Sequence, residues 1–429
     1  MVKKRYVQVG VGGKARFFYE SLAEKYSDTS ELVAFCDINR KRMEFAVKNL
    51  ADHFNYPAPA LYGVDEFEKM IEEQKPDCVI VTSIDRTHDK YIIKAMEMGC
   101  DVLSEKPMTI NVDKCQAIVD AVKRTGRNLR VSFNYRYAPF HSIVRKLIMD
   151  GTIGEVKQVH FEWMLNTDHG ADYFRRWHRD KRNSGGLLVH KSTHHFDLVN
   201  FWLGTKPKEV FAFGDLMFYG RENAENRGIT KFYYRTHGSE NAQGDPFAIV
   251  MEGNEYLEPL YLNAESEDGY LRDQSVFGDG ISIEDVMNVL VKYESGAQMS
   301  YSLNAFSAVE GFHVAFTGTK GRIEMHVEEQ TYVNAASEKD EEGLAKSRTI
   351  KVFPMFGEAY TVDIPMMQGG HGGGDPILLE DLFGANPPND PLKRAASYVD
   401  GAMSILTGIA ANKSIASGLP VKIKDLVKF

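Results

Sequence analysis

Two histidines and a carboxylate share one short segment of this chain of 429 residues. His190 and His194 are four residues apart, and Asp197 follows three residues later. If one helix spans all three, their side chains share a face and form a proton relay, because an imidazole takes or gives a proton near neutral pH. A metal site is an alternative, but it needs a further ligand and Lys191 adds a positive charge, so we expect no metal. A hydrogen-bonded core histidine is the other reading of His194.

A second group of residues could bind a dinucleotide. The segment Val7–Ala15, VQVGVGGKA, is typical of a strand that runs into Gly-x-Gly-x-x-Ala and then into a helix. In that setting Gly10 permits a tight turn, Gly12 lets the backbone approach a pyrophosphate, and Ala15 allows close helix packing. The N-terminus of the helix offers N–H groups to the anion. The segment therefore predicts a dinucleotide phosphate site.

Asp37 ends the next predicted strand, where an acidic residue binds ribose hydroxyls. Its charge opposes the 2′-phosphate of NADP, and Ile38 stands where a phosphate-binding site would favour serine or arginine. Both residues favour NAD. Arg40, Lys41 and Arg42 weaken this inference, since any of them could turn toward a 2′-phosphate, although the exposed face of the next helix is their alternative place.

Lys106 directly follows the predicted strand Val102–Ser104 and precedes Pro107. Ligands of doubly wound folds bind at the carboxyl edge of the parallel strands, so we predict that Lys106 lies in the active site. An ammonium beside an oxidised nicotinamide can stabilise an alkoxide or pass on its proton. The alternative is a surface lysine at the end of a strand.

The first 135 residues alternate short apolar strands with amphipathic helices, which predicts an α/β domain with parallel strands joined by right-handed crossovers. The predicted strands are Tyr6–Val9, Leu32–Cys36, Cys78–Thr82, Val102–Ser104 and Leu129–Phe133. The predicted helices are Lys14–Tyr26, Arg40–Phe54, Asp65–Glu73, Thr87–Met98 and Val112–Thr125. The domain, residues 1–135, is the expected nucleotide-binding domain.

After about residue 150 the pattern changes to alternating strands, which predicts a second domain over residues 136–429 with a largely antiparallel sheet. Its clearest strands are Val156–Met164, Val286–Tyr293 and Ala297–Asn304, and its clearest helices are Ser192–Leu203 and Leu392–Ala410. We expect the last helix to pack back on the first domain. Residues 219–280 are polar, rich in tyrosine and weakly periodic, which predicts a long excursion at the rim of the sheet.

The composition argues against several classes of protein. Apolar residues make up 43% of the chain and charged residues 26%, as in globular proteins with a large core. The net charge of −9 disfavours nucleic acids and anionic membranes as partners, and no apolar run has the length of a membrane span. Four cysteines lie mostly in apolar patterns, as expected of reduced thiols in a cytoplasmic protein: Cys36, Cys78, Cys100 and Cys115.

These motifs together resemble those of the Gfo/Idh/MocA oxidoreductases, the family of glucose-fructose oxidoreductase and inositol dehydrogenase. The resemblance spans about residues 5–325 and rests on motifs in the same order: the glycine turn at 10–15, Thr82–His88, Glu105-Lys106-Pro107, Asn134-Tyr135-Arg136-Tyr137, Gly185-Gly186 leading to His194 and Asp197, and FTGTKG at 316–321. It implies an N-terminal Rossmann domain and a C-terminal α+β domain on a large, mostly antiparallel open sheet.

The resemblance also implies which residues meet the ligands. NAD would be bound by Gly10, Gly12, Gly13, Asp37, Thr82, His88, Glu105 and Asn134. Lys106 and His194 would flank a sugar carbinol, with His194 taking the hydroxyl proton as hydride leaves for nicotinamide C4, and Tyr135 and Arg136 would line the pocket. The chain departs from the family at His190, where an aspartate usually stands. This change removes an anion that would orient the base and leaves the proton path open.

Two further clusters are candidates for the substrate pocket. Residues 169–182 are basic and aromatic, so Trp177 could stack on a pyranose ring and the arginines could bind an anionic sugar, or the segment is a solvated loop. His371 precedes three glycines that could bring the backbone against the substrate. After them, Asp375 and Pro376 are predicted to be the N-cap and first residue of a helix.

We therefore expect an NAD-dependent oxidoreductase, with NADP less favoured, that removes hydride from a carbinol carbon of a sugar, sugar derivative or cyclitol. The alternative is an NAD-dependent glycoside hydrolase that oxidises its substrate transiently, eliminates the aglycone, adds water and returns the hydride. His190 favours this route, which needs an additional acid or base. A catalytically silent NAD-binding sensor fits Lys106 and His194 poorly. An exposed sheet face predicts a homo-oligomer, a dimer or a tetramer.

Overall fold

Two β-sheets organise the chain in the computed structural model, which describes residues 2–333, 343–365, 367, 369–387 and 389–429. The first sheet is parallel, in the order β3-β2-β1-β4-β5-β6 that characterises the Rossmann fold. Its strands are β1 Lys4–Val9, β2 Ser30–Cys36, β3 Ala60–Tyr62, β4 Cys78–Val81, β5 Asp101–Ser104 and β6 Leu129–Val131. The helices on its two faces are α1 Arg16–Ala23, α2 Arg40–Phe54, α3 Phe67–Gln74, α4 His88–Glu97 and α5 Val112–Thr125.

The predicted strands and helices of this first unit all form, with ends that differ by a few residues. Local capping explains two of the boundaries: Asn39 accepts a hydrogen bond from the Arg42 N–H at the start of α2, and Gly126 ends α5 in the left-handed region at φ 65°. The edge strand β3 was not predicted. Its three residues are too few for a periodic pattern to be visible.

The second sheet has the order β14-β13-β12-β11-β7-β10-β9-β8-β15. The pair β7–β10 is parallel and the other neighbouring pairs are antiparallel, which confirms the predicted mostly antiparallel sheet. Its strands are β7 Val156–Asn166, β8 Pro207–Asp215, β9 Val286–Tyr293, β10 Gln298–Ser307, β11 Gly311–Gly318, β12 Gly321–Glu329, β13 Ala345–Pro354, β14 Tyr360–Thr361 and β15 Val421–Lys422. Burial alternates along β9 and β10, so one face of the sheet is packed and the other is open.

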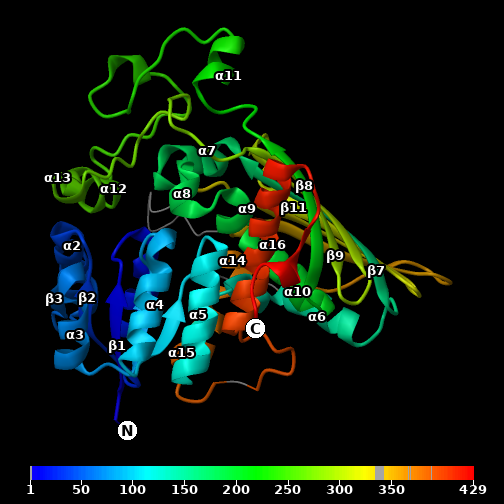
Figure 1. Ribbon diagram of the computed structural model, residues 1–429, viewed down its shortest axis with the longest axis horizontal. Helices are drawn as coiled ribbons and strands as arrows, with labels where there is room; N and C mark the ends of the chain where they lie inside the picture. Colours follow the sequence, from blue (N-terminus) through cyan, green and yellow to red (C-terminus); the bar gives the residue numbers. More distant parts are fainter. Residues whose placement is uncertain (1, 334–342, 366, 368, 388) are drawn as a thin grey trace.

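A layer of helices lies between this sheet and the first unit (Figure 1). The helices are α6 Pro139–Met149, α7 Thr167–Arg175, α8 Lys181–Ser184, α9 Leu187–His190, α10 Ser192–Leu203, α14 Gly370–Gly373, α15 Asp375–Phe383 and α16 Tyr398–Ser417. The last helix was predicted at Leu392–Ala410 and begins six residues later, because Ser397 and Asp400 form a capping box at its N-terminus.

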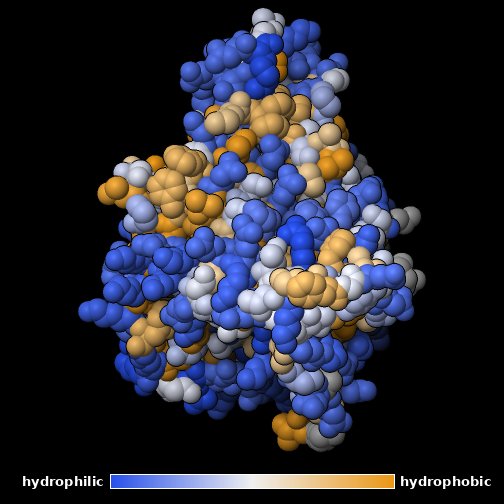
Figure 2. All heavy atoms as spheres, turned by 90° about the vertical axis from the view of Figure 1, so that its right-hand side faces the viewer, coloured by the Kyte–Doolittle hydropathy of each residue, from blue (hydrophilic) through white to orange (hydrophobic). Residues whose placement is uncertain are grey.

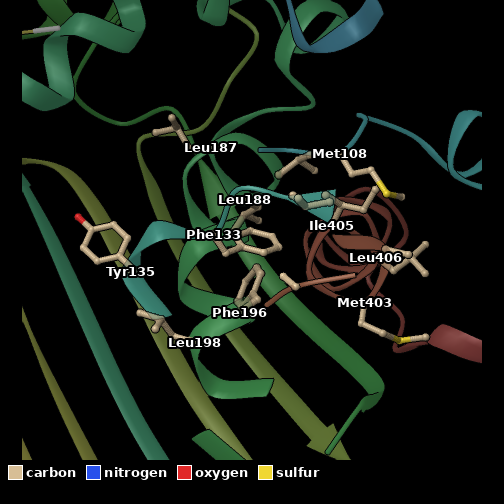
Figure 3. Close-up of a cluster of buried hydrophobic side chains, with 14 of the residues drawn as sticks. Met108, Phe133, Tyr135, Leu187, Leu188, Phe196, Leu198, Met403, Ile405 and Leu406 are labelled. Carbon is tan, nitrogen blue, oxygen red and sulfur yellow. The ribbon is translucent and has the colours of Figure 1, made fainter. Parts of the chain in front are cut away.

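The helix α16 joins the two units. It contacts α5 and β6 of the first unit and α9, α10 and β8 of the second. A Cβ on Gly401 would lie 2.7 Å from a Val131 methyl, and one on Gly408 would lie 2.1 Å from the Leu188 carbonyl oxygen. Around α16, Phe133, Phe196 and Ile405 share one buried hydrophobic cluster (Figure 3). This packing sets the position of α9, which carries His190, relative to the first unit.

The sequence pattern placed residues 219–280 at the rim of the second sheet, but in the structure they extend beyond it. They contain the short helices α11 Arg221–Asn226, α12 Leu257–Leu260 and α13 Glu265–Asp268. The segment extends away from the sheet, and α12 packs against α2 of the first unit (Figure 1). The position of this segment depends on long-range contacts with α2, which a local sequence pattern cannot predict.

Surface and composition add three findings. Within the described part of the chain, no helix combines the length and the apolar character needed to cross a bilayer. The face of the molecule in Figure 2 is mainly hydrophilic, with hydrophobic residues gathered in its upper half. All four cysteines are buried free thiols.

Candidate active site

The glycine turn lies at the carboxyl edge of β1. Gly10 has φ 85°, and a Cβ there would lie 2.4 Å from the backbone of Ser83, so this position requires glycine. The Thr82 hydroxyl donates to the Gly10 carbonyl at 2.6 Å and fixes the turn against the loop after β4. At Gly12 a Cβ would meet nothing closer than the Tyr261 hydroxyl, at 3.9 Å. The backbone at Gly12 thus has the open space that a pyrophosphate requires.

Asp37 connects the end of β2 to this turn. Its carboxylate accepts hydrogen bonds from the Val11 N–H at 2.5 Å and the Asn39 N–H at 2.8 Å. Burial raises the pKa of Asp37, and these two N–H groups act in the opposite direction. Asp37 therefore lies at the ribose end of the predicted nucleotide site, next to the glycine turn.

Lys106 lies in the loop after β5, half-buried, and its ammonium donates to the His190 carbonyl oxygen at 3.5 Å. The Glu105 carboxylate accepts from the Lys106 N–H at 2.9 Å. The His88 ring lies between the carbonyl oxygens of Pro107 and Ser83, each 2.9 Å from a ring nitrogen. His88 thus braces the two loops that carry Ser83 and Lys106.

Asp85, in the loop after β4, binds His190. The Oδ2 of Asp85 lies 2.6 Å from the Nδ1 of His190, and both residues are buried. Burial raises the pKa of Asp85 well above its ordinary value, while the charges of Lys106 and Arg176 lower it. A carboxyl group on Nδ1 fixes the tautomer and the orientation of an imidazole, so Asp85 positions the His190 ring.

Aromatic rings surround His190. The ring centroids of His178 and Tyr173 lie 4.2 Å and 5.5 Å from that of His190. Trp177 is half-buried, stacks on His178 and lies 6.0 Å from His190, edge to face. Burial lowers the pKa of His178 well below its ordinary value. The predicted pocket residue Trp177 is therefore next to His190.

His194 lies deeper than His190. It is 2% exposed, and its ring lies against Tyr135 at 4.9 Å and against Phe133 and His371 at 6.0 Å each. The relay predicted through Asp197 does not form, because α9 ends at His190, α10 begins at Ser192, and Asp197 pairs with another residue.

Arg136 is the partner of Asp197. Its Nε and Nη2 donate to the two carboxylate oxygens of Asp197 at 2.7 Å and 2.5 Å, and Nη2 also lies 3.0 Å from the Asp400 carboxylate. The guanidinium is 3% exposed. These contacts hold α10 and the start of α16 to the segment after β6.

Asn134 and the glycine-rich segment meet at Asp375. The Asn134 amide donates to Asp375 Oδ1 at 2.7 Å, and His371 Nδ1 lies 3.0 Å from Oδ2. The predicted N-cap role of Asp375 is wrong, because the N-cap of α15 is Gly374 and the Asp375 carboxylate is turned to these two side chains. A Cβ on Gly372 would lie 2.3 Å from the Phe140 ring, so this backbone packs against Phe140.

Glu329 and Tyr135 form a second buried polar contact. The Tyr135 hydroxyl donates to Glu329 Oε1 at 3.4 Å, and it points away from the hydrophobic cluster (Figure 3). Burial raises the pKa of Glu329 to about 7, although the nearby Lys191 lowers it. Among the described residues, no cluster of three His, Cys, Asp or Glu side chains has the arrangement of a metal site.

Comparisons with known proteins show the family of the chain. Residues 4–133 match the model of the oxidoreductase family with an NAD-binding Rossmann fold, and residues 145–423 match that family's C-terminal alpha/beta domain. The chain belongs to the Gfo/Idh/MocA oxidoreductase family.

Two relatives match this chain over nearly its whole length, and a third matches less than half of it. "Putative oxidoreductase YteT" of Bacillus subtilis (strain 168) is 36% identical over 99% of this chain and 98% of its own length. "Myo-inositol 2-dehydrogenase" of Thermotoga maritima is 22% identical over 98% of both chains. A "Glycosyl hydrolase family 109 protein" of Shewanella sp. (strain W3-18-1) is 27% identical over 42% of this chain and 41% of its own. The crystal structure of an aldose-aldose oxidoreductase from Caulobacter crescentus shares the fold, with a TM-score of 0.62 at 17% identity over 98% of this chain and all of that one.

Sequence reasoning did not single out three residues that the structure brings against the predicted site residues His190 and Tyr135. Asp85 follows β4 as Lys106 follows β5, so the edge argument that selected Lys106 could have selected it too. His178 lay within the basic segment but was not singled out. Glu329 ends β12, and only the packing around it separates it from the exposed Glu328 and the half-buried Glu324 of the same strand.

Proposed function

We propose that this Gfo/Idh/MocA protein is an NAD-dependent oxidoreductase that removes hydride from a carbinol carbon of a sugar, sugar derivative or cyclitol. The observation that carries the proposal is the contact of Lys106 with His190, whose ring is bound to Asp85, at the sheet edge that also bears the glycine turn. In alcohol oxidation an imidazole backed by a carboxylate can take the hydroxyl proton, and an ammonium can stabilise the alkoxide.

The cofactor would be held by residues of the first unit. The backbone at Gly10 and Gly12 would bind the pyrophosphate, and Asp37 the ribose. Gly13 would lie beside the pyrophosphate, with its N–H donated to the Tyr261 hydroxyl. Bound NAD supplies the carbon that accepts the hydride. Thr82, His88, Glu105 and Asn134 brace the loops at this edge, which supports a role in shaping the nicotinamide end of the site.

The substrate hydroxyl would lose its proton to His190, while the ammonium of Lys106 stabilises the alkoxide. Asp85 supports this assignment, because a carboxylate on Nδ1 stabilises the imidazolium that forms. His194 is the competing base. Its place against Tyr135 and His371 supports a role in lining the deeper end of the pocket, and the separate variants described below distinguish the two histidines.

The sugar ring would lie against aromatic side chains. Trp177 and Tyr135 are the candidates, since each lies next to one of the two histidines. Arg136 was predicted to bind substrate, but two carboxylates surround its guanidinium, so we propose a scaffolding role for it.

The proposal can be tested with purified protein, NAD in excess over the substrate, and a panel of sugars, cyclitols and aryl glycosides. Growth of reduced-nicotinamide absorbance in proportion to substrate supports the dehydrogenase. Failure to bind any nicotinamide nucleotide would rule it out. Tight NAD binding without any conversion would favour a sensor instead.

A redox-neutral glycoside hydrolase is the second candidate. It would use the same residues, with bound NAD returning the hydride at the end of each turnover. The Asp85–His190 pair supports it by supplying the additional acid or base, as does the partial similarity to the hydrolase from Shewanella. Release of aglycone without net formation of NADH would favour this candidate over the first.

We also propose that the protein is a cytoplasmic homo-oligomer. Phe211 and Phe213 of β8 and Leu290 of β9 lie on the open face of the second sheet, and Phe213 and Leu290 are exposed. An apolar group on an open sheet face favours association with a second copy. Light scattering coupled to gel filtration tests this, and a monomer mass at micromolar concentration would contradict it.

A further inference from the structure

The excursion of residues 219–280 reaches the ribose end of the predicted nucleotide site. Helices α12 and α13 lie next to α2, whose first residues follow Asp37 (Figure 1). The Asn39 amide donates to the Ala264 carbonyl at 2.9 Å, and the Gly13 N–H donates to the Tyr261 hydroxyl at 3.1 Å. The excursion therefore contacts both the glycine turn and the start of α2.

Arg42 is held by this excursion. Its Nε donates to the Leu260 carbonyl at 3.1 Å, and its guanidinium forms an ion pair with Asp268 of α13. The side chains of Arg42 and Asp268 are 9% and 8% exposed. The ion pair is thus largely shielded from solvent, where screening by salt is weak.

The other two basic residues after Asp37 also have partners. The Lys41 ammonium donates to the Asn263 carbonyl at 2.9 Å and to the Ser266 hydroxyl at 3.1 Å. Arg40 pairs with Glu44 along the exposed face of α2. All three basic residues that could bind a 2′-phosphate therefore have other partners. Lys41 and Arg42 bind groups of the excursion.

Asp268 also places a second negative charge near Asp37. The charge of Asp268 raises the pKa of Asp37, and the charge of Arg42 lowers it, so the three groups lie within electrostatic range of one another. A 2′-phosphate at this end of the site would meet the carboxylates of Asp37 and Asp268. The three basic residues that follow Asp37 each already have another partner: Arg40, Lys41 and Arg42.

We propose that Asp268 is a specificity residue that excludes the 2′-phosphate of NADP, by adding its charge to that of Asp37 and by retaining Arg42. This inference rests on the proposed nicotinamide site and assigns a role to a segment more than two hundred residues away from it in sequence. Discrimination between NAD and NADP would thus depend on both the Rossmann domain and the excursion.

The experiment compares the full-length wild-type protein with Asp268→Asn, which removes the charge and retains the oxygen that accepts from the Tyr270 N–H. Dissociation constants for NAD and NADP are measured by calorimetry, together with ADP-ribose and its 2′-phosphate as probes that lack the nicotinamide. We expect the preference for the unphosphorylated nucleotide to fall by about tenfold or more, since one charge is lost at close range.

Two variants serve as controls. Glu265→Gln removes the same charge from the same helix, but Glu265 pairs with Arg235 inside the excursion, so its preference should stay within about twofold of wild type. Asp268→Glu keeps the charge and should retain the preference for NAD. If Asp268→Asn does not fold, Asp268→Ser provides the same comparison.

The failure of this inference is distinguishable from that of the proposed function. If the wild-type protein binds NAD and Asp268→Asn shows an unchanged preference, the role of Asp268 is overturned while the nicotinamide site stands. An equal loss of preference in Glu265→Gln would also overturn it. If neither nucleotide nor either probe binds the wild-type protein, the proposed site itself is wrong.

Discussion

The imidazole of His190 and the carboxylate of Asp85 meet across the boundary between the two units, with Nδ1 and Oδ2 2.6 Å apart. One residue comes from the loop after β4 and the other from the end of α9. The contact joins the Rossmann sheet to the predicted substrate side, next to Lys106. It also gives His190 the anion that the resemblance had led us to expect at position 190 itself.

Replacement of Asp85 tests this pair. We expect Asp85→Asn to lower kcat by about 10²-fold while NAD binding changes little, because the amide cannot stabilise an imidazolium. Steady-state kinetics and calorimetry measure the two quantities. Asp89→Asn is the matched control, since Asp89 lies four residues on and pairs with Lys114. Equal losses in the two variants would show that the effect is not specific to the His190 partner.

The two histidines can be separated by single substitutions. We expect His190→Ala to lower kcat by at least about 10²-fold, as loss of a general base does. His194→Ala should affect KM more than kcat if His194 lines the pocket beside Tyr135. The reverse pattern, with the larger kcat loss at His194, would assign the base to that residue.

We expect the free energy of unfolding to depend on pH because of the buried Glu329. Burial raises its pKa from 4.5 to about 7, so between these values the folded protein holds a proton that the unfolded chain has released. The free energy of unfolding should therefore fall as pH rises through this window, by up to about 3 kcal/mol for this group alone.

Glu329→Gln is the variant that isolates this effect. Denaturant unfolding of both proteins between pH 5 and pH 7 should show wild type losing stability relative to the variant. The groups that act on Glu329 include Lys191, Glu310, His371 and Tyr135, and all four are retained in the variant. A constant difference in stability across the window would contradict the raised pKa.

Substitution of Gly408 tests whether the packing of α16 positions the candidate site. A side chain there would lie 2.1 Å from the Leu188 carbonyl, so Gly408→Ala must push α9 and His190 away from α16. We expect a loss of about 1–3 kcal/mol in stability and at least tenfold in kcat. Thermal unfolding and kinetics measure both. Ala410→Gly, in the same buried helix, should lower stability by a similar order without that kcat loss.

The arrangement of the first unit was predictable because it follows from local patterns. The apolar strands, the glycine turn and the amphipathic helices can each be recognised from the residues that form them. The parallel arrangement of the strands follows from the right-handed crossovers between them. The start of α16 was misplaced by the apolar periodicity, which continues past the capping box at Ser397. The course of residues 219–280 was missed because contacts such as Arg42 with Asp268 join residues far apart in sequence.

The candidate site was predictable where residues lie at strand ends. Lys106 and Asp37 were selected by position, and the structure brings both to the predicted edge. The partner of His190 was not predicted, because helical spacing pointed to Asp197, whereas tertiary packing gives Asp197 to Arg136 and Asp85 to His190. Spacing along a helix identifies neighbours on one surface, and it carries no information about groups from another domain.

The proposed mechanism depends on hydride transfer that is assisted by Lys106. Single-turnover mixing measures this step most directly. Wild-type protein saturated with NAD is mixed with the most active compound of the substrate panel, and the absorbance of reduced nicotinamide is followed in time. We predict a rise in wild type that is slowed by at least about 10²-fold in Lys106→Ala and unchanged in Lys90→Ala, whose side chain is exposed. A rise at the wild-type rate in Lys106→Ala would contradict the proposed mechanism.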